Sequence, residues 1–229
     1  MGNSLPPAIF IAGTLGLDFL NSLARPIAEV VDWLGNGSDF LSWMKQAGLL
    51  TVDDIAVIKS SMSSRKLDQV AAKARDLRDW LRGFVTEHMG RPLKAQALTQ
   101  LGPLHDLLTS DQMFLSLVPG PAPWPKQTPG KASRTIFHLR AQRRWRKPDS
   151  LLSPIAEEIA KFISSADFRY VKACQGDHCI LFFLDQTRRH ARRWCSMAVC
   201  GNRAKQEAHL ARLKKRKPFK KSASRSASR

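Results

Sequence analysis

The sequence predicts a mostly α-helical fold, in which a multi-helical N-terminal domain precedes a small α+β module. Apolar residues recur at helical spacing from Thr14 to about residue 109. Short runs of aromatic and β-branched residues then flank the first pair of a cluster of four cysteines, which a basic segment follows. With 229 residues and 43% hydrophobic content, the chain can bury one sizeable core and has room for a small second domain.

The first two expected helices lie between residues 15 and 50. The segment GLDFLNSLA places Leu17, Leu20 and Leu23 at helical spacing. In DFLSWMKQAGLL, Ser38 is the expected N-cap, and Asp39 falls in the first turn, where a carboxylate is favoured by the helix dipole.

Three more helices are expected before residue 109. Thr51 and Asp54 have the spacing of a capping box ahead of the run IAVI, and another helix is expected from Pro92 to about Leu108. The longest helix is predicted over residues 64–89, with Gly90 as its C-terminal stop. Its apolar stripe comprises Leu67, Val70, Ala71, Ala74, Leu77, Leu81 and Phe84.

The pattern changes after residue 117. The stretch 117–133 holds five prolines, so we expect an exposed loop or internal linker without regular structure. RTIFHLRAQRRW then favours a strand, and DSLLSPIAEEIAKFISS favours a helix with Ser153 as its cap and Pro154 at its first position. FRYVKAC and CILFFLDQ are predicted as short strands on either side of the first cysteine pair.

The positive charge is concentrated at the C-terminal end. Of the formal net charge of +18, residues 1–186 contribute 22 Lys and Arg against 18 Asp and Glu, whereas residues 187–229 contribute 15 against one. Such a segment attracts polyanions, and nucleic acid fits it better than an acidic membrane surface does. From Pro218 onward the sequence is polar and of low complexity, so it should be disordered.

The apolar segments do not predict a membrane protein. No run approaches the ~20 apolar residues that a spanning helix needs, and the apolar stretch 6–17 has no Lys or Arg ahead of it to act as a signal-peptide n-region. We therefore expect a cytoplasmic protein without a membrane partner. In that reducing compartment, clustered cysteines are more typical of a metal site than of disulfides.

The cysteines have the spacing Cys174-x4-Cys179-x15-Cys195-x4-Cys200. Two short pairs joined by a medium loop can bring four thiolates to one tetrahedral zinc ion. Four thiolates close the coordination shell, so a structural zinc is predicted rather than a catalytic one. His178 or His190 could replace one cysteine, although surface positions account for both histidines as well.

The second cysteine pair predicts the start of a helix. On one continuous α-helix, Cys195 and Cys200 would lie ~140° apart, so Cys195 should precede the helix and Cys200 should lie in its first turn. A strand-flanked knuckle followed by a ligand at a helix N-terminus is treble-clef-like. Arg192, Arg193 and Arg203 could offset part of the negative charge of a four-thiolate site.

The stretch CQGDHCILFFLDQTRRHARRWCSMAVCGNRAK resembles the CGNR zinc-finger family, whose name-giving tetrapeptide begins here at Cys200. The resemblance implies four cysteine ligands to zinc and a DNA-binding zinc finger over residues 170–213. The segment QGDH inside the first pair and His190-Ala191 in the middle loop depart from the family pattern.

Upstream, LGLDFLNSL at residues 15–23 resembles the start of the ABATE domain, a stress-induced transcription regulator that accompanies this finger. The two resemblances imply an ABATE-like helical domain at residues 1–165, the zinc finger at 170–213 and a basic disordered tail at 214–229. They also imply a zinc-dependent transcriptional regulator, whose N-terminal domain senses a ligand or mediates association.

Two basic clusters are expected to contact nucleic acid. When the helix after Cys200 is projected at ~100° per residue, Ala204, Ala208 and Ala211 share a narrow face suited to packing against the zinc module. The predicted contacts come from a second face and from the middle loop, and they are Lys205, His209, Arg212 and Arg216, and Arg188, Arg189, Arg192 and Arg193.

Asn202 and Arg203 have side chains that could read base edges. Internal roles are the alternative for both residues. Asn202 could bond to the loop backbone near the zinc, and Arg203 could neutralise thiolate charge or pair with an acid.

The sequence offers no positive indication of an enzyme. The adjacent carboxylates at 53–54 and 157–158 would point in different directions on a helix, and no metalloprotease, nucleophile-elbow or phosphate-loop motif is found. We therefore expect a DNA-binding regulator, with a nonspecific RNA- or ribosome-associated zinc protein as the alternative and a protein-interaction zinc domain as a third hypothesis. A homodimer and an unidentified small-molecule effector are further expected partners.

Overall fold

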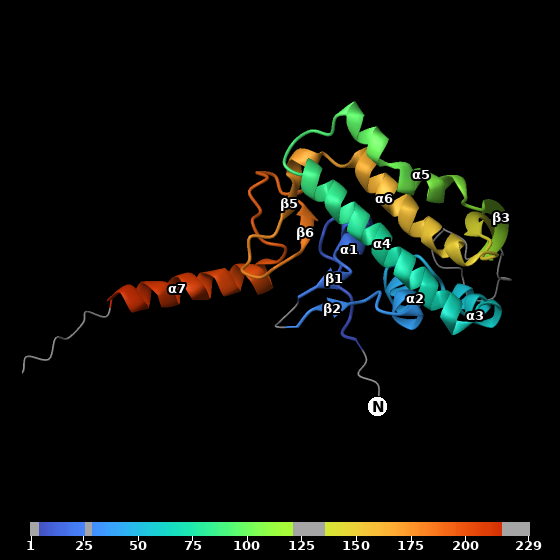
Figure 1. Cartoon of the computed structure of the whole chain (residues 1–229), viewed down its shortest axis with the longest axis horizontal. Coiled ribbons are helices and arrows are strands. Elements are labelled where there is room, and N and C mark those ends of the chain that lie inside the picture. The colour runs from blue at the N-terminus through green and yellow to red at the C-terminus, as the bar shows by residue number, and fades with distance from the viewer. Residues whose placement is uncertain (1–4, 26–28, 121–135, 217–229) are drawn as a thin grey trace, which may run out of the picture.

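The computed structural model describes residues 5–25, 29–120 and 136–216 (Figure 1). Its α-helices are α1 (Leu15–Leu20), α2 (Gly37–Gln46), α3 (Val52–Ser61), α4 (Ser64–His88), α5 (Gly102–Thr109), α6 (Ser153–Ser165) and α7 (Asn202–Arg216). Short 3₁₀-helices are η1 (Ala95–Gln100), η2 (Pro148–Leu152) and η3 (Phe168–Tyr170), and η4 (Met197–Gly201) is a π-helical turn. The strands are β1 (Leu23–Ala24), β2 (Val31–Asp32), β3 (Met113–Gly120), β4 (Ile136–Arg143), β5 (Val171–Ala173) and β6 (Phe182–Leu184).

Helix α4 is the long central helix of the helical domain (Figure 1). It ends one residue short of the predicted range, and all seven residues of its predicted apolar stripe are buried. Helix α2 packs against α4, α1 contacts both α4 and α6, and α5 lies on α6. The core thus follows from the apolar periodicity of the longest helix.

The short helix α1 lies unusually close to α6 because Gly16 has no side chain. A Cβ atom at Gly16 would be 2.8 Å from the Cβ of Phe162 and 2.9 Å from the carbonyl oxygen of Glu158. These distances are below van der Waals contact, so any larger residue would push α1 away from α6. The close packing buries Leu17, Phe19 and Leu20 completely or nearly so.

Two predicted N-caps are wrong, and one is confirmed. Helix α2 begins at Gly37, and its cap is Asn36, whose side chain accepts a hydrogen bond from the Asp39 N–H, so Ser38 lies inside the first turn. Ser153 is likewise inside a helical stretch, because η2 runs directly into α6. At Thr51 both reciprocal bonds of the capping box are present.

Tertiary structure also changes two expected segments. The single helix expected over residues 92–108 is divided into η1 and α5. The proline-rich stretch was expected to lack regular structure, which is wrong for residues 117–120, because β3 runs to Gly120 and pairs in antiparallel fashion with the expected strand β4. Pro119 is tolerated because the described sheet has two strands, so each is an edge strand. Residues 121–133 of that stretch lie outside the described residues.

The hairpin β5–β6 joins the cysteine-rich segment to the helical domain. Its strands are antiparallel, with Val171 opposite Leu184, and both were predicted. The rings of Phe182 and Phe183 are buried in the same hydrophobic core as α1 and α4. The small hairpin β1–β2 was not expected from the sequence.

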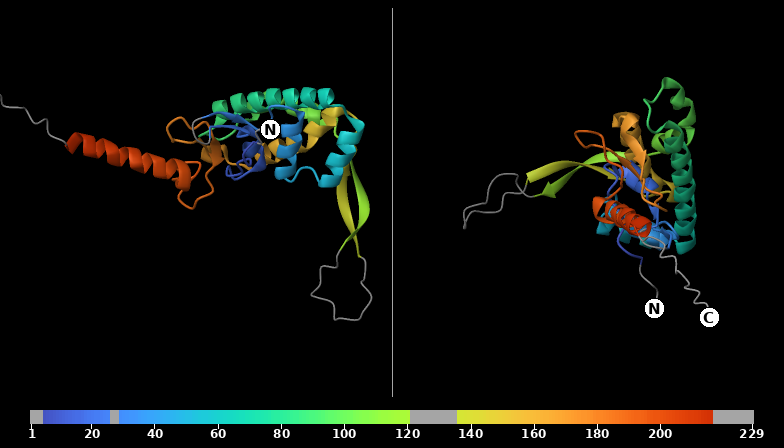
Figure 2. Two further views of the ribbon diagram at one scale, coloured as in Figure 1. Left: turned by 90° about the horizontal axis from the view of Figure 1, so that it is seen from below. Right: turned by 90° about the vertical axis from the view of Figure 1, so that its left-hand side faces the viewer.

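Helix α7 extends away from the rest of the protein, and the hairpin β3–β4 extends from the other end (Figures 1 and 2). Helix α7 ends at Arg216, three residues into the tail expected to be disordered, and residues 217–229 lie outside the described ones. Within the described part of the chain, no helix combines the length and apolar character needed to cross a membrane.

Candidate metal centre and basic surface

The four cysteines converge on one point, as their spacing predicted. Their Sγ atoms all lie within 4.8 Å of one another. The Sγ of Cys195 lies 3.8 Å from that of Cys179 and 3.6 Å from that of Cys200. A tetrahedral zinc ion with Zn–S bonds of about 2.3 Å requires S–S distances of about 3.8 Å. The donor set therefore fits zinc, and the two separations at Cys195 are close to the tetrahedral value.

The first cysteine pair sits in a tight turn between β5 and β6. The Cys174 N–H bonds to the Leu181 carbonyl at 2.8 Å, and the Cys179 N–H bonds to the Gly176 carbonyl at 3.1 Å. A Cβ atom at Gly176 would lie 2.9 Å from the Cβ of Cys200 and 3.0 Å from its Sγ. Glycine is therefore required here for the second cysteine pair to approach the first.

Hydrogen bonding within the cluster favours one thiolate. Bonds from the Cys179 and Cys195 thiols, and from the N–H groups of Cys195 and Gly176, lower the pKa of Cys174. Sharing protons with Cys174 raises the pKa of both Cys179 and Cys195. A divalent ion supplies the charge needed to ionise the remaining thiols, so metal binding here should release protons.

The second pair has the arrangement expected at a helix start. Cys195 precedes η4, Cys200 lies within η4, and α7 follows directly. The turn is wider than an α-helical turn, and it is closed by the Ser196 hydroxyl, which accepts from the Val199 N–H at 3.4 Å. A π-type turn of this kind brings Cys200 round to the side of Cys195 before α7 begins.

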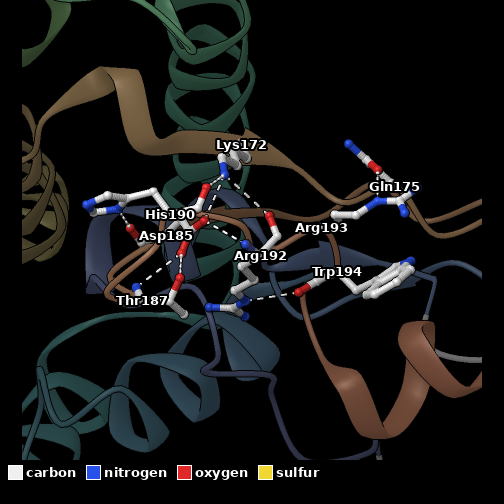
Figure 3. A network of polar contacts seen from close by, with 8 residues as sticks. All are labelled: Lys172, Gln175, Asp185, Thr187, His190, Arg192, Arg193 and Trp194. Carbon is white, nitrogen blue, oxygen red and sulfur yellow. Dashed lines mark hydrogen bonds and ion pairs between the residues drawn. The ribbon is translucent and has the colours of Figure 1, made fainter.

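Asp185 organises the loop between β6 and Cys195 (Figure 3). Its carboxylate accepts hydrogen bonds from Lys172 Nζ at 2.7 Å, Thr187 Oγ1 at 2.6 Å and the Arg192 N–H at 2.8 Å. The residue is 1% exposed. Burial alone would raise its pKa, but these bonds outweigh burial and hold the pKa of Asp185 below its usual value. The loop of residues 186–193 is therefore fixed by a buried anion.

Lys172 extends this network to the far side of the loop. Its ammonium group also donates to the His190 carbonyl at 2.6 Å, and the His190 ring stacks on Tyr170 with a centroid distance of 3.5 Å. His190 is thus engaged within the protein. Sequence reasoning missed Asp185 and Lys172 as organising residues, and the available signal was an acidic residue at the end of the buried run LFFLD.

Arg192 was predicted to contact nucleic acid, but its guanidinium is used inside the protein. It donates to the carbonyls of Trp194, Cys195 and Ile11, and it lies 4.2 Å from the centroid of the Phe183 ring. The three carbonyl groups accept hydrogen bonds from the guanidinium, and the Phe183 ring contacts its planar face. From the sequence alone, this charge would be taken as available to a partner. We therefore remove Arg192 from the nucleic-acid surface.

The other arginines of the loop are at the surface. Arg188 and Arg189 are exposed. Arg193 is exposed as well, although its Nε donates to Gln175 Oε1 at 2.7 Å and its guanidinium lies over the Trp194 ring (Figure 3). The loop therefore presents Arg188 and Arg189 to solvent on a rigid support.

Helix α7 does not pack against the zinc module as predicted. Ala208 and Ala211 are exposed, as are all described side chains from Lys205 to Leu213. The predicted alanine packing face is therefore wrong, because α7 points away from the body and no other described segment lies beside it (Figure 2).

The same free position leaves Lys205, His209 and Arg212 on an open helix surface. Arg216 lies in the last turn of α7. Asn202 donates its side-chain amide to the Ala198 carbonyl at 3.2 Å, which matches the internal alternative for that residue. The Arg203 side chain is partly buried, and it has no hydrogen-bond or ion-pair partner among the described residues.

The zinc module is bonded directly to the start of the helical domain. The side chain of Asn21 both donates to and accepts from the backbone of Phe182, at 2.8 and 2.9 Å. The Leu184 N–H bonds to the Ala12 carbonyl at 2.8 Å. Asp18 holds the backbone ahead of α1 by accepting hydrogen bonds from the N–H groups of Ile11 and Ala12, both at 2.9 Å. The segment LGLDFLNSL, which contains α1, thus supplies the side chains that bond the helical domain to the zinc module.

Two protein-family models match the chain. Residues 13–166 match ABATE, described as "putative stress-induced transcription regulator", and residues 170–213 match the CGNR zinc finger. A search of curated proteins gave no match. The second model covers the four-cysteine cluster, and its match identifies zinc as the cofactor of this cluster.

Proposed function

The chain belongs to the ABATE family and carries a CGNR zinc finger, and from this premise we propose that it is a zinc-dependent DNA-binding transcriptional regulator. The exposed basic helix α7, which begins at the cysteine cluster and projects from the protein, carries this proposal. The proposal places the protein in the cytoplasm and gives it no catalytic activity.

Zinc has a structural role in this proposal. Cys174, Cys179, Cys195 and Cys200 are its ligands, and four thiolates leave no position for a reacting water. The bound ion neutralises thiolate charge and joins the β5–β6 turn to η4. Because α7 follows η4 without a break, the ion sets the direction in which the helix leaves the protein.

Helix α7 has the size and charge to lie in a groove of DNA. Its 15 residues span about 22 Å, and the major groove is about 12 Å wide, which admits one helix. The helix contains six Lys and Arg residues and one Glu. On an α-helix, Lys205, His209, Arg212 and Arg216 fall on one face, so they can follow a phosphate backbone together.

Arg188 and Arg189 provide a second contact beside this face. They are exposed on the loop that Asp185 fixes. The backbone of this loop is therefore already ordered before DNA binds. Phosphate contacts of this kind position a protein on DNA without reading sequence. Arg203 is the remaining residue of the site that could read a base edge, since a bidentate arginine recognises guanine.

The first experiment is selection from fragmented genomic DNA with the zinc-loaded full chain at about physiological salt, followed by sequencing of the retained fragments. A short shared motif would support a sequence-specific regulator. Uniform retention, or equal affinity for duplex RNA at matched salt, would favour the alternative of a nonspecific RNA-associated protein.

A matched pair of variants tests the role of α7. Arg212→Ala should weaken DNA binding and lower the slope of log affinity against log salt by about one, as expected for one lost phosphate contact. Arg65→Ala removes an arginine that is also exposed, at the start of α4 and away from the zinc module (Figure 1), and should change neither. Equal effects of the two substitutions would exclude α7 as the binding element.

Binding by the basic tail alone, at residues 214–229, is an alternative that needs its own control. Deleting residues 214–229 should reduce affinity but retain binding, whereas Cys200→Ser should abolish binding through loss of the folded module. If the deletion alone abolishes binding and Cys200→Ser does not, the basic tail and not the zinc finger binds DNA.

The N-terminal domain is assigned the regulatory role, through binding a ligand or mediating association. The bonds from Asn21 to Phe182 and from Arg192 to Ile11 place this domain in direct contact with the zinc module. A change in the helical domain can therefore reach the DNA-binding element through a few hydrogen bonds.

A further inference from the structure

The hairpin β3–β4 presents an apolar face to solvent. In an antiparallel pair, residues that lie opposite each other share a face, and the register places Leu115 opposite Ala141 and Leu117 opposite Leu139. Every second residue of β3, starting at Met113, is exposed. The large side chains on this face are Met113, Leu115, Leu117, Phe137 and Leu139, which are 55% to 67% exposed.

This face is unusual for a hairpin that stands alone. The hairpin extends clear of the helices (Figure 2), and its described sheet has no third strand. A two-stranded hairpin is marginally stable in water unless something covers its apolar side. Five apolar side chains, each about 60% exposed, present on the order of 500 Å² of apolar surface. This is near the upper end of the roughly 300–600 Å² found for the largest apolar patch of a typical monomer, and such patches are often functional.

The chemistry of the face excludes a charged partner. Arg143 is its one charged residue among the described positions, and this guanidinium is already paired with Asp111 at 3.0 Å and with Glu157. Nucleic acid or a charged peptide would therefore find no free counter-charge there. An equally apolar and neutral surface is the complementary partner.

A second copy of this chain supplies such a surface. Two hairpins packed face to face would bury on the order of 1,000 Å², which reaches the lower limit for a specific interface. A two-fold axis lets one patch serve both partners. Layers of sheet pack about 10 Å apart, so the two sets of leucines can interdigitate as they do in a β-sandwich core.

The position of the hairpin suits a dimer of a strongly basic protein. The hairpin and α7 lie at opposite ends of the molecule in Figure 1 and in the left view of Figure 2. The repulsion between exposed charges is screened beyond about 8 Å at physiological salt. Association through the hairpins therefore keeps the two basic helices apart and leaves both free to bind DNA.

We propose that the outer face of the β3–β4 hairpin packs against the same face of a second copy and forms a symmetric homodimer. The proposal deepens the association role proposed above for the N-terminal domain. It predicts an interface built from the five apolar side chains named above. Oligomeric state can be measured without nucleic acid, so failure of the dimer and failure of DNA binding are separate results.

The test uses light scattering during size-exclusion chromatography of the zinc-loaded full chain, at high salt and micromolar concentration. The wild type should have about twice the 25.7 kDa mass of one chain. The double variant Leu117→Asp/Leu139→Asp places two like charges opposite each other on the apolar face, and its mass should fall to that of one chain. Both positions are exposed, so circular dichroism and zinc content should stay unchanged.

A matched control is available in Leu98→Asp. Leu98 is 63% exposed on η1, away from the hairpin, and this variant should remain a dimer. A wild type that is monomeric throughout the concentration range would overturn the proposal. A dimer that survives the double substitution, or one that Leu98→Asp disrupts equally, would do the same.

Discussion

Replacing Asp185 with asparagine should destabilise the zinc module, although the two side chains have almost the same shape. The Asp185 carboxylate accepts from Lys172 Nζ and from two groups of Thr187, and it also accepts from the Arg192 N–H. Asparagine has one acceptor oxygen in place of two, and its NH₂ group would face donors. Lys172 would then lie against the loop without its anion.

The size of the expected loss in unfolding free energy follows from the burial of the ion pair. Breaking a buried ion pair by removing one partner costs about 3–5 kcal/mol. The Lys172 side chain is 30% exposed, so water recovers part of that loss, and asparagine keeps one acceptor. We therefore expect Asp185→Asn to lower the free energy of unfolding by about 2–3 kcal/mol.

Asp149→Asn is a matched control. Asp149 forms an ion pair with Lys73 at 2.6 Å, against 2.7 Å for Asp185 and Lys172, but both side chains of the control pair are 53% exposed. Exposed pairs contribute about 0–1 kcal/mol. The two ion pairs have nearly the same distance. They differ in burial and in the three further hydrogen bonds that Asp185 accepts from Thr187 and Arg192.

The assay is urea unfolding of each zinc-loaded protein at pH 7, followed by circular dichroism. The pKa of Asp185 is lowered in the folded protein, so its contribution is complete above the unfolded value of about 3.9 and is lost as pH falls through the lower folded value. The difference between wild type and Asp185→Asn should thus be constant from about pH 8 to 5. A loss below about 1 kcal/mol, or one equal to that of Asp149→Asn, would refute the reasoning.

Three further substitutions test the contacts around the metal centre. Gly176→Ala places a Cβ against Cys200 and should weaken zinc binding in competition with a chelator, whereas Gly83→Ala, in open space on α4, should leave zinc affinity unchanged. Burial raises the pKa of Asp18, so its stabilising protonated form is lost as pH rises above about 4. Asp18→Asn should therefore be at least as stable as wild type at pH 7, and its melting temperature should depend less on pH over this rise. Asn21→Ala leaves two buried backbone groups of β6 unpaired and should cost about 2–4 kcal/mol in urea unfolding; a cost under about 1 kcal/mol would mean that water replaces the amide.

Features set by local sequence were predictable. The apolar stripe of α4 depends on periodicity, and the Thr51 capping box depends on two residues three apart, so both are found as expected. The convergence of the four cysteines was also predictable, because thiolates at this spacing are typical of a zinc site. The N-caps at Ser38 and Ser153 failed, because Asn36 offers an equally good acceptor two residues earlier and because η2 adds a helical turn ahead of α6.

Features set by distant contacts were not predictable. Arg192 carries the same charge in the sequence as Arg188, and what distinguishes it is the proximity of Phe183 and the Ile11 carbonyl, the latter 181 positions away. The alanine face of α7 would pack well if a neighbour lay beside it, but no such neighbour lies along the described helix. Helical periodicity states which residues share a face, and it does not state whether that face is covered.

The contacts around Cys195 join the ABATE domain to the zinc finger. Arg192 donates both to the carbonyl of Cys195 and to that of Ile11, and Asp18 of α1 holds the Ile11 backbone from its other side. Asn21, one turn further along, is paired with β6. A movement of α1 must therefore either break these buried bonds, each worth about 1 kcal/mol or more, or carry the loop before Cys195 with it. The second course changes the direction of α7, and with it the placement of the helix proposed to bind DNA.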